Sequence, residues 1–282
     1  MNVAADLGTV TWVDDRLVPA GETAIRPEDR GLVGDGVFEA IKVIHGTPFA
    51  LRRHLERLVT SATPLGIPID LERVRDAVAG VLETDAGRQP RSWLRITVTA
   101  GPTRMGKSER STAPTVMAAV APMPVWDRPA RVAVLPWRRN ERGATTGLKT
   151  ISYIENGLGL RHANGLGADE GIFANTAGNL CEGTGTNVFV IHRDRIVTPP
   201  LSAGCLAGVT RGLLLEWQPD VVEADVPIDL LATCDEAFLT STSRDVHPIE
   251  SIDGRRLANV RGPLTAQAVA CFAEHAAADA DP

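Results

Sequence analysis

The chain has 282 residues, of which 44% are hydrophobic and 23% charged, so it can form one large domain or two medium ones with a sizeable core. Its formal net charge of -6 argues against nonspecific nucleic-acid binding, which requires a basic surface. No run approaches the roughly 18 apolar residues of a membrane span, and the first residues lack the apolar core of a signal peptide. Four scattered cysteines without a CxxC pair predict no metal site and indicate reduced thiols, so a cytoplasmic location is expected.

The first half of the chain predicts strands and two helices. "TVTWVDDRLVPA" alternates apolar and polar residues on either side of residues 14–15, which predicts two short strands around a turn. "GVFEAIKVIHGTPFALRRHLERL" predicts a strand, a turn at residues 45–46 and an amphipathic helix with Arg57 beside its buried face. Four residues at helical spacing form that face: Leu51, Leu55, Leu58 and Val59. A second helix over about residues 70–84 precedes the predicted strands "SWLRITVTAG" and "TVMAAVAPMP".

The prolines of "APMPVWDRPA" predict a linker over residues 122–129 between a domain of residues 1–121 and a larger one of residues 130–282. The second part predicts a strand in "RVAVLPW", a helix from about residue 151 to 164 and then consecutive strands separated by turns. The Ala-rich tail after Glu274 is expected to fray. Because helices and strands alternate irregularly, the predicted class is α+β in two unequal parts.

The stretch "TTGLKTISYIEN" raises three interpretations of Lys149. A phosphate-binding P-loop fails, because "GATTGLKT" has three residues between its glycines and a leucine before the lysine. Most lysines are solvated surface residues, which is the simplest interpretation. The third is a Schiff-base nucleophile, because apolar neighbours desolvate an ammonium group and lower its pKa.

Three other stretches allow anion binding beside plainer interpretations. "LCEGTGTNVF" is a glycine-rich turn in which backbone N–H groups can approach a ligand, although Glu182 would repel a phosphate. "GVTRGLLLEW" places Thr210 before an apolar helix, where it can be an N-cap or part of a phosphate site. "TSTSRDVHP" is a hydroxyl-rich loop that is either an ordinary turn or a cradle for an anion.

Six segments occur in one order along nearly the whole chain: "DRGLVGDGVFEAIKV", "HLERLVTSA", "GLKTISYIEN", "GADEGIFANTAGNLCEGTGTNVFVI", "TPPLSAGCLAGVTR" and "DEAFLTSTSRDVHPI". In this order they resemble the class IV aminotransferases, which are pyridoxal phosphate enzymes of fold type IV. The resemblance implies a small N-terminal α+β domain, a larger C-terminal pseudo-barrel domain and a homodimer.

The resemblance also implies roles for individual residues in binding pyridoxal 5'-phosphate. Lys149 matches the lysine that forms the Schiff base with the cofactor. Glu182 matches the acid that keeps the pyridine nitrogen protonated, and Arg57 matches the phosphate-binding arginine. Further positions match contacts of the cofactor's ring or phosphate: Tyr153, Val209, Thr210 and Thr242.

The substrate contacts implied by the resemblance are less uniform. Phe38 matches an aromatic residue that lines the substrate pocket. D-amino acid transaminases usually hold the substrate carboxylate with an Arg-x-His pair on a loop from the other subunit, but "PTRMGK" has no histidine at that place. Without that histidine, Arg104 or Arg244 is the expected carboxylate contact, because a guanidinium can bind a carboxylate through two hydrogen bonds. Further candidate substrate contacts are Val33, Arg95, Lys107 and Ser243.

The activity expected from the resemblance is transfer of an amino group between an amino acid and a 2-oxo acid, with D-amino acids favoured and (R)-amines as further substrates. One alternative is a 4-amino-4-deoxychorismate lyase that releases pyruvate and p-aminobenzoate. Another is a branched-chain aminotransferase, which fits less well because Val33 stands where an aromatic residue commonly lines the pocket. A noncatalytic binding protein is the alternative from another class, and the joint presence of Lys149, Glu182 and Arg57 argues against it.

Overall fold

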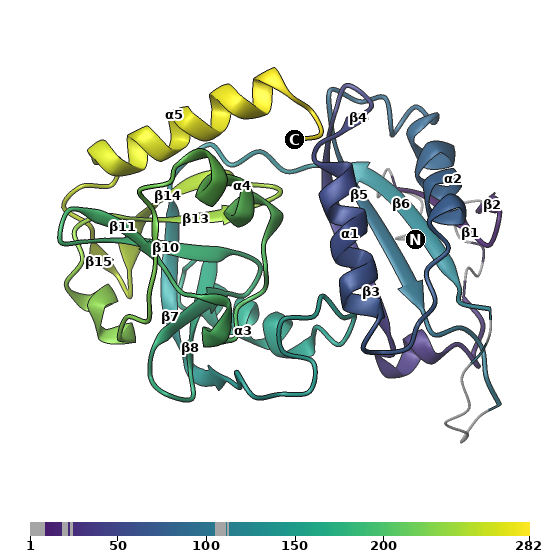
Figure 1. Ribbon diagram of the computed structural model, residues 1–282, viewed down its shortest axis with the longest axis horizontal. Coiled ribbons are helices and arrows are strands. Elements are labelled where there is room, and N and C mark those ends of the chain that lie inside the picture. The colour runs from purple at the N-terminus through teal and green to yellow at the C-terminus, as the bar shows by residue number, and fades with distance from the viewer. Residues whose placement is uncertain (1–8, 19–21, 23–24, 105–110, 112) are drawn as a thin grey trace. The chain divides into compact units, whose positions relative to one another are not determined.

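The computed structural model describes residues 9–18, 22, 25–104, 111 and 113–282, and the chain forms two compact units (Figure 1). The first unit contains Met1–Pro124, Leu148–Tyr153 and Asp281. The second contains Val125–Gly147, Ile154–Ala280 and Pro282. The chain therefore leaves the first unit in the Pro-rich segment, returns at Leu148 and leaves again after Tyr153. The division expected from the sequence, with a single crossing at residues 122–129, does not include this return. Residues 148–153 are called the lysine segment below.

The first unit contains a six-stranded antiparallel sheet in the order β2-β1-β6-β5-β3-β4. Its strands are β1 (Val10–Val13), β2 (Arg16–Val18), β3 (Gly36–Ile44), β4 (Thr47–Pro48), β5 (Arg91–Thr99) and β6 (Val116–Pro122). The predicted hairpin turns are confirmed, because residues 14–15 and 45–46 all have positive φ. β3 pairs with β5 along its whole length, from Gly36 opposite Thr99 to Ile44 opposite Arg91.

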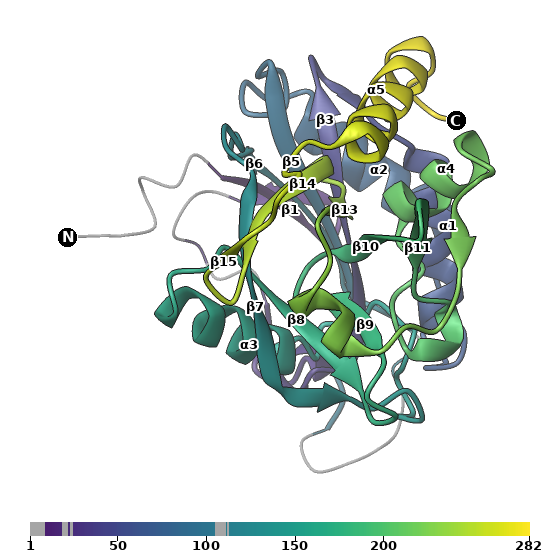
Figure 2. The ribbon, with the colours of Figure 1, turned by 90° about the vertical axis from the view of Figure 1, so that its left-hand side faces the viewer.

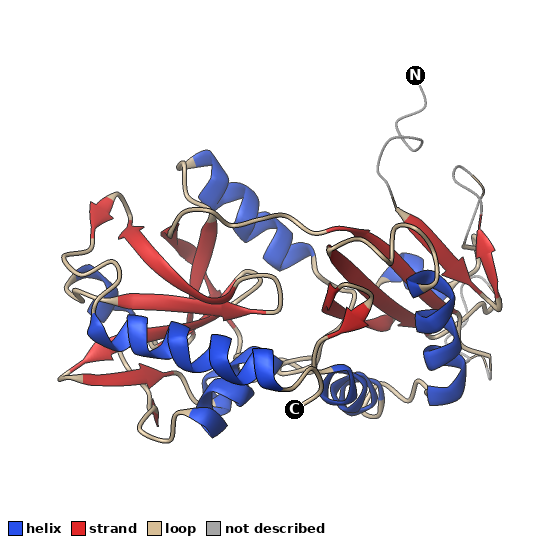
Figure 3. Ribbon diagram, turned by 90° about the horizontal axis from the view of Figure 1, so that it is seen from above, coloured by secondary structure: helices blue, strands red, loops and turns tan. Residues whose placement is uncertain are grey.

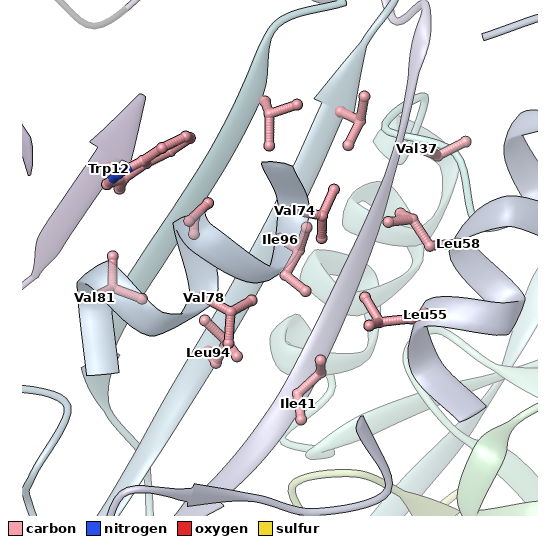
Figure 4. Close-up of a cluster of buried hydrophobic side chains, with 14 of the residues drawn as sticks. Trp12, Val37, Ile41, Leu55, Leu58, Val74, Val78, Val81, Leu94 and Ile96 are labelled. Carbon is pink, nitrogen blue, oxygen red and sulfur yellow. The ribbon is translucent and has the colours of Figure 1, made fainter. Parts of the chain in front are cut away.

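Two helices pack on this sheet and enclose its apolar core (Figure 4). They are α1 (Leu51–Ala62) and α2 (Leu71–Leu82), and the carboxylate of Asp70 caps α2 by accepting from the backbone N–H of Glu72 and Arg73. Leu55 and Leu58 of α1 lie fully in the core, as their spacing predicts. Because α1 packs on β3, any polar residue on the inner face of either element is buried between them.

The second unit contains a nine-stranded mixed sheet that curls (Figure 2). Its strands are β7 (Ala130–Arg139), β8 (Glu170–Asn175), β9 (Leu180–Gly183), β10 (Asn187–His192), β11 (Arg195–Thr198), β12 (Val222–Glu223), β13 (Ala237–Ser241), β14 (Asp245–Ile252) and β15 (Arg255–Arg256). The main path runs β12-β11-β10-β13-β14-β7-β8-β9, with β15 paired to β14. β9 also contacts β10, which lies five places away along that path, so the sheet bends back on itself.

Three α-helices cover this second sheet (Figure 3). They are α3 (Ile154–Gly165), which packs on β7 and β8, α4 (Val209–Trp217), and α5 (Pro263–Ala278), which packs on α4 and β14. Short 3-10 turns occur at Arg30–Val33, Leu201–Ala203 and Ile228–Ala232. Among the described residues, no helix is both long and apolar enough to cross a membrane.

Three local predictions were wrong. The helix expected from residue 151 begins at Ile154, because the residues before it pair with β3 instead. The tail after Glu274 remains helical through Ala278, since α5 packs on its neighbours. The N-cap of α4 is Gly208, and Thr210 is the second residue of the helix.

Candidate active site

The lysine segment is fixed to the first unit by backbone hydrogen bonds. The amide N–H of Phe38 donates to the carbonyl of Lys149 at 3.0 Å, and that of Ile151 donates to Gly36 at 3.0 Å. The amide N–H of Lys149 donates to the Ser61 hydroxyl on α1, also at 3.0 Å. Lys149 is therefore held from both sides, by β3 and by the C-terminal half of α1.

The side chain of Lys149 lies over the ring of Phe38, with the ammonium nitrogen 4.3 Å from the ring centroid. The guanidinium carbon of Arg95 lies 4.5 Å from the same centroid. Tyr153 meets Phe38 edge to face, with centroids 5.3 Å apart, and its ring centroid is 5.8 Å from the Lys149 nitrogen. These four residues, Phe38, Arg95, Lys149 and Tyr153, are called the Phe38 cluster. Two cations, Lys149 and Arg95, therefore contact one aromatic ring.

Arg57 belongs to a second group in the same unit, called the Glu39 cluster after its three members Glu39, His54 and Arg57. The Glu39 carboxylate accepts from Arg57 Nε at 2.9 Å and from Arg57 Nη2 at 2.6 Å. His54 Nδ1 lies 2.7 Å from the same carboxylate. Burial would raise the pKa of Glu39, but Arg57 and His54 outweigh it and lower the pKa to about 2.

The contacts of His54 determine which ring nitrogen carries a proton. Burial, opposed by Glu39, lowers the pKa of His54, so the ring is neutral near pH 7. Glu39 is ionised and can only accept, so Nδ1 is the protonated nitrogen that donates to it. The 3.4 Å approach of Arg57 Nη2 to Nδ1 then joins two donors and is not a hydrogen bond.

In the second unit, Glu182 near the end of β9 is buried, and a backbone amide and a guanidinium contact its carboxylate. Its Oε2 accepts from the backbone N–H of Leu206 at 2.8 Å. Its Oε1 lies 3.3 Å from Arg139 Nε, so an opposite charge stands beside the carboxylate. The guanidinium of Arg139 also stacks on Phe173, 4.3 Å from its centroid. Glu182 is thus a buried, oriented carboxylate held by β7, β9 and the loop before α4.

The first turn of α4 contains two predicted residues, Val209 and the buried Thr210. No side chain caps this helix, so its first N–H groups are available to an anion. A Cβ on Gly208 would stand 2.0 Å from the Asn187 amide oxygen, so any larger residue at this entry to the helix would displace the Asn187 side chain. Thr242 lies in the turn between β13 and β14, half-buried.

Arg244 follows in the same turn, but its guanidinium is enclosed. Its Nη2 lies 3.4 Å from the buried carboxylate of Glu170 and donates to the Asp169 carbonyl at 3.1 Å. Its guanidinium carbon lies 3.9 Å from the ring centroid of Trp126. The Glu170 carboxylate also accepts from the hydroxyl of Thr184 and, at 3.2 Å, from the N–H of Gly185. Arg244 is therefore already paired, and these contacts do not favour it as the group that binds a substrate carboxylate.

The other candidate substrate residues are not brought into the Phe38 cluster. Val33 ends a 3-10 turn and is 73% exposed. Arg104 is exposed beyond β5, and Lys107 lies outside the described residues. Ser243 is buried, 3.5 Å from the hydroxyl of Ser241.

Sequence reasoning missed three residues that contact the predicted ones. Glu39 binds Arg57, His54 donates to Glu39, and Arg139 stands beside Glu182. The spacing of His54 and Arg57, three residues apart on α1, was the available signal, because such residues are neighbours on a helix surface. Glu39 lies on a different element, strand β3, so its pairing with Arg57 left no spacing signal in the sequence.

Comparison with known proteins shows the family. The chain matches the family described as Amino-transferase class IV over residues 36–252. It is 30% identical to a putative branched-chain-amino-acid aminotransferase of Methanocaldococcus jannaschii, covering 88% of this chain and 89% of that protein. It is 29% identical to a D-alanine aminotransferase of Bacillus licheniformis, covering 89% and 91%.

A solved structure extends this comparison to the fold. The crystal structure of a putative 4-amino-4-deoxychorismate lyase from Legionella pneumophila matches with a TM-score of 0.83 and 25% identity, covering 90% of this chain and 96% of that one. The predicted α+β class and fold type IV are therefore confirmed. The chain belongs to the class IV aminotransferase family, and it is an enzyme of a class whose cofactor is pyridoxal phosphate.

Proposed function

We propose that this enzyme is a transaminase for α-amino acids, with D-amino acids preferred, and that Arg95 receives the substrate's α-carboxylate. The observation that carries the proposal is that Lys149 and Arg95 contact the same ring, that of Phe38. In an α-amino acid the amino group and the carboxylate are attached to one carbon. In the proposed arrangement, a substrate whose amino group reacts at Lys149 turns its carboxylate toward Arg95, whose guanidinium can bind it through two hydrogen bonds.

The residues present fit pyridoxal phosphate. Lys149 supplies an amine fixed on β3 and α1, and Glu182 supplies an oriented, buried carboxylate. The uncapped first turn of α4 with Thr210 suits a phosphate, because several N–H groups and the helix dipole point toward it. Arg57 contributes a guanidinium that is held in place. Each kind of group that the cofactor requires is thus present in the chain.

In the proposed enzyme the cofactor would be held by six residues: Lys149, Arg57, Glu182, Val209, Thr210 and Thr242. Tyr153 would lie beside its ring. When bound, pyridoxal phosphate supplies an electron sink that stabilises negative charge at the substrate's Cα. Lys149 would take the proton from the substrate's Cα and later release it to a carbon other than Cα, as amino transfer requires, and Phe38 would shield this proton movement from water. Glu182, as an oriented anion, favours a protonated pyridine nitrogen.

The position of the carboxylate determines which enantiomer reacts. The Cα–H bond must point toward Lys149, and the amino group is fixed where the cofactor binds. With these two substituents placed, exchanging the carboxylate and the side chain inverts the configuration. Arg95 therefore acts as the residue that selects the enantiomer, and the absence of a histidine in "PTRMGK" supports a carboxylate site on β5 instead of on a partner's loop.

The test is a half-reaction of the holoenzyme, mixed separately with D-alanine, L-leucine and aminodeoxychorismate, and followed by absorbance and product analysis. Conversion to the pyridoxamine form by D-alanine is expected. Faster conversion by L-leucine would contradict the D-preference and favour branched-chain substrates. Pyruvate and p-aminobenzoate appearing together would replace the transaminase with a lyase.

A variant tests the role of Arg95 separately. Arg95→Ala is expected to raise the KM for D-alanine about tenfold to a hundredfold, because a charge-assisted bidentate contact is lost. The matched control is Arg75→Ala, which removes an exposed arginine of α2 and is expected to leave KM unchanged. An unchanged KM in Arg95→Ala would contradict the carboxylate assignment. A homodimer is also part of the proposal, and sedimentation velocity of the holoenzyme tests it.

A further inference from the structure

Among the described charged residues of the first unit, Glu39 is the most enclosed, because its side chain is fully buried between β3 and α1. Strand β3 otherwise points apolar residues, such as Val37 and Ile41, toward the core on this face. A carboxylate there has a high desolvation cost, so its donors must compensate for burial. The function proposed so far gives Glu39 no role.

The three hydrogen bonds of Glu39 restrain Arg57 in a particular way. Oε1 faces Arg57 Nε and Oε2 faces Nη2, so the two planar groups lie fork to fork. This arrangement fixes both the plane and the rotation of the guanidinium. His54 restrains the carboxylate in turn, since its Nδ1–H donates to Oε2. The direction of the guanidinium is therefore set by contacts inside the first unit.

We propose that Glu39 is a positioning residue for the cofactor: it orients Arg57 so that the guanidinium meets the phosphate, and His54 steadies Glu39. This inference depends on the proposed role of Arg57 in holding the phosphate. Arg57 then acts through the fixed direction of its guanidinium more than through its net charge, because the buried Glu39 carboxylate already balances that charge.

Glu39 can act on Arg57 by orienting its guanidinium or only by neutralising its charge, and the two roles predict opposite changes in phosphate binding when Glu39 is shortened. If Glu39 orients Arg57, shortening Glu39 weakens phosphate binding even though the charges are unchanged. If Glu39 only neutralises a buried arginine, a retracted carboxylate leaves more positive charge toward the phosphate and binding stays equal or becomes tighter. The conservative variant Glu39→Asp separates the two, because it keeps the charge but cannot reach both Nε and Nη2 from the same backbone position.

The experiment titrates the apoenzyme with pyridoxal 5'-phosphate and, separately, with pyridoxal, following absorbance and tryptophan fluorescence. Both compounds carry the aldehyde that reacts with Lys149, and only one carries the phosphate. The ratio of the two dissociation constants therefore isolates phosphate recognition. The Arg57→Ala variant gives the ratio that is expected when the Arg57 guanidinium is absent, and it serves as the reference. Glu56→Asp, an exposed glutamate of α1, is the matched control for shortening an acid.

In Glu39→Asp the preference for the phosphorylated compound is expected to fall about tenfold, toward the Arg57→Ala value, with pyridoxal binding unchanged. His54→Phe keeps both charges and loses one donor to Glu39, and it is expected to show a smaller fall in the same ratio. It also tests the proposal if Glu39→Asp does not fold. Wild-type ratios in the variants that fold would overturn the inference, provided that Arg57→Ala lowers the ratio. An unchanged ratio in Arg57→Ala would instead overturn the phosphate role of Arg57. Neither result depends on which amino acid is the substrate.

Discussion

Each unit of the molecule buries a glutamate beside an arginine, and the two glutamates respond to burial in opposite ways. In the first unit Arg57 and His54 lower the pKa of Glu39 to about 2. In the second unit burial raises the pKa of Glu170, and Arg244 and Thr184 only partly oppose it. Both carboxylates are almost inaccessible to solvent, so exposure does not explain the difference.

Geometry explains it. Arg57 meets Glu39 with two nitrogens at 2.9 and 2.6 Å, whereas Arg244 approaches Glu170 with one nitrogen at 3.4 Å. The remaining donors to Glu170 are a hydroxyl and a backbone N–H, which stabilise a carboxylate less than a cation does. In this molecule the pair that meets fork to fork, together with His54, lowers the pKa of its carboxyl group, and the pair joined by one 3.4 Å approach does not.

The largest expected effect comes from neutralising each glutamate. Glu39→Gln is expected to lower the free energy of unfolding at pH 7 by about 3 to 5 kcal/mol, because Arg57 loses its buried partner. Glu170→Gln is expected to cost less, about 2 kcal/mol, because burial already disfavours the ionised carboxylate there although Arg244 loses its charged partner. Urea unfolding of both variants measures the difference, and equal losses would contradict the contrast between the two pairs.

The two glutamates should also give stability a pH dependence of opposite sign. Because the pKa of Glu39 falls from its usual 4.5 to about 2 on folding, its contribution is complete above pH 4.5 and is lost as the pH falls toward 2. The raised pKa of Glu170 makes its contribution complete below pH 4.5 and lost as the pH rises through the folded value.

Urea unfolding of the wild type and both glutamine variants from pH 2 to 7 measures these contributions. As the pH falls, the excess in free energy of unfolding of the wild type over Glu39→Gln should shrink. The excess of the wild type over Glu170→Gln should instead grow as the pH falls. Differences of the same sign would show that one of the two pKa directions is wrong.

A smaller effect is expected from Thr184, whose hydroxyl donates to Glu170. Thr184→Val keeps the shape of the side chain and removes that donor, so it should lower the free energy of unfolding by about 1 to 2 kcal/mol. The loss should be larger at pH 7 than at pH 4, because the ionised carboxylate needs the donor more. Thr176→Val, at an exposed hydroxyl that pairs with Glu141, is the control and should cost less.

The smallest effect concerns Trp126, which stacks on Arg244. Trp126→Leu removes a cation–π contact and leaves the Glu170 pair in place, so a loss of about 1 kcal/mol is expected. Urea unfolding at pH 7 measures it. A loss larger than that of Glu170→Gln would mean that the tryptophan, and not the Glu170 carboxylate, is the main partner of Arg244.

The sequence predicted much of the first unit because local patterns determine it. The helical spacing of Leu55 and Leu58 identified the core face of α1, and the turn residues identified the hairpins. The start of α3 could not be read locally, because the hydrogen bond from Ile151 to Gly36 joins residues far apart in the chain. A pairing at that separation has no periodic signal.

In the candidate site, too, contacts between residues far apart in the chain could not be predicted from local patterns. Lys149, Arg57 and Glu182 were found from motifs, and their proposed roles stay predictions. Arg244 was predicted as a carboxylate binder because it is basic and follows a hydroxyl-rich turn. The structure instead buries it against Glu170 and Trp126, and burial of a particular arginine depends on contacts from other strands.

The return of residues 148–153 to the first unit also affects how the protein can form during synthesis. A ribosome that has released residues up to Pro124 has made every strand of the six-stranded sheet, yet the segment that pairs with the start of β3 is still to come. The amide N–H of Phe38 and the Ser61 hydroxyl must wait for Lys149 until β7 of the second unit has been translated. Cutting the gene at the Pro-rich segment would therefore give an N-terminal fragment that lacks Lys149 and the segment that pairs with the start of β3.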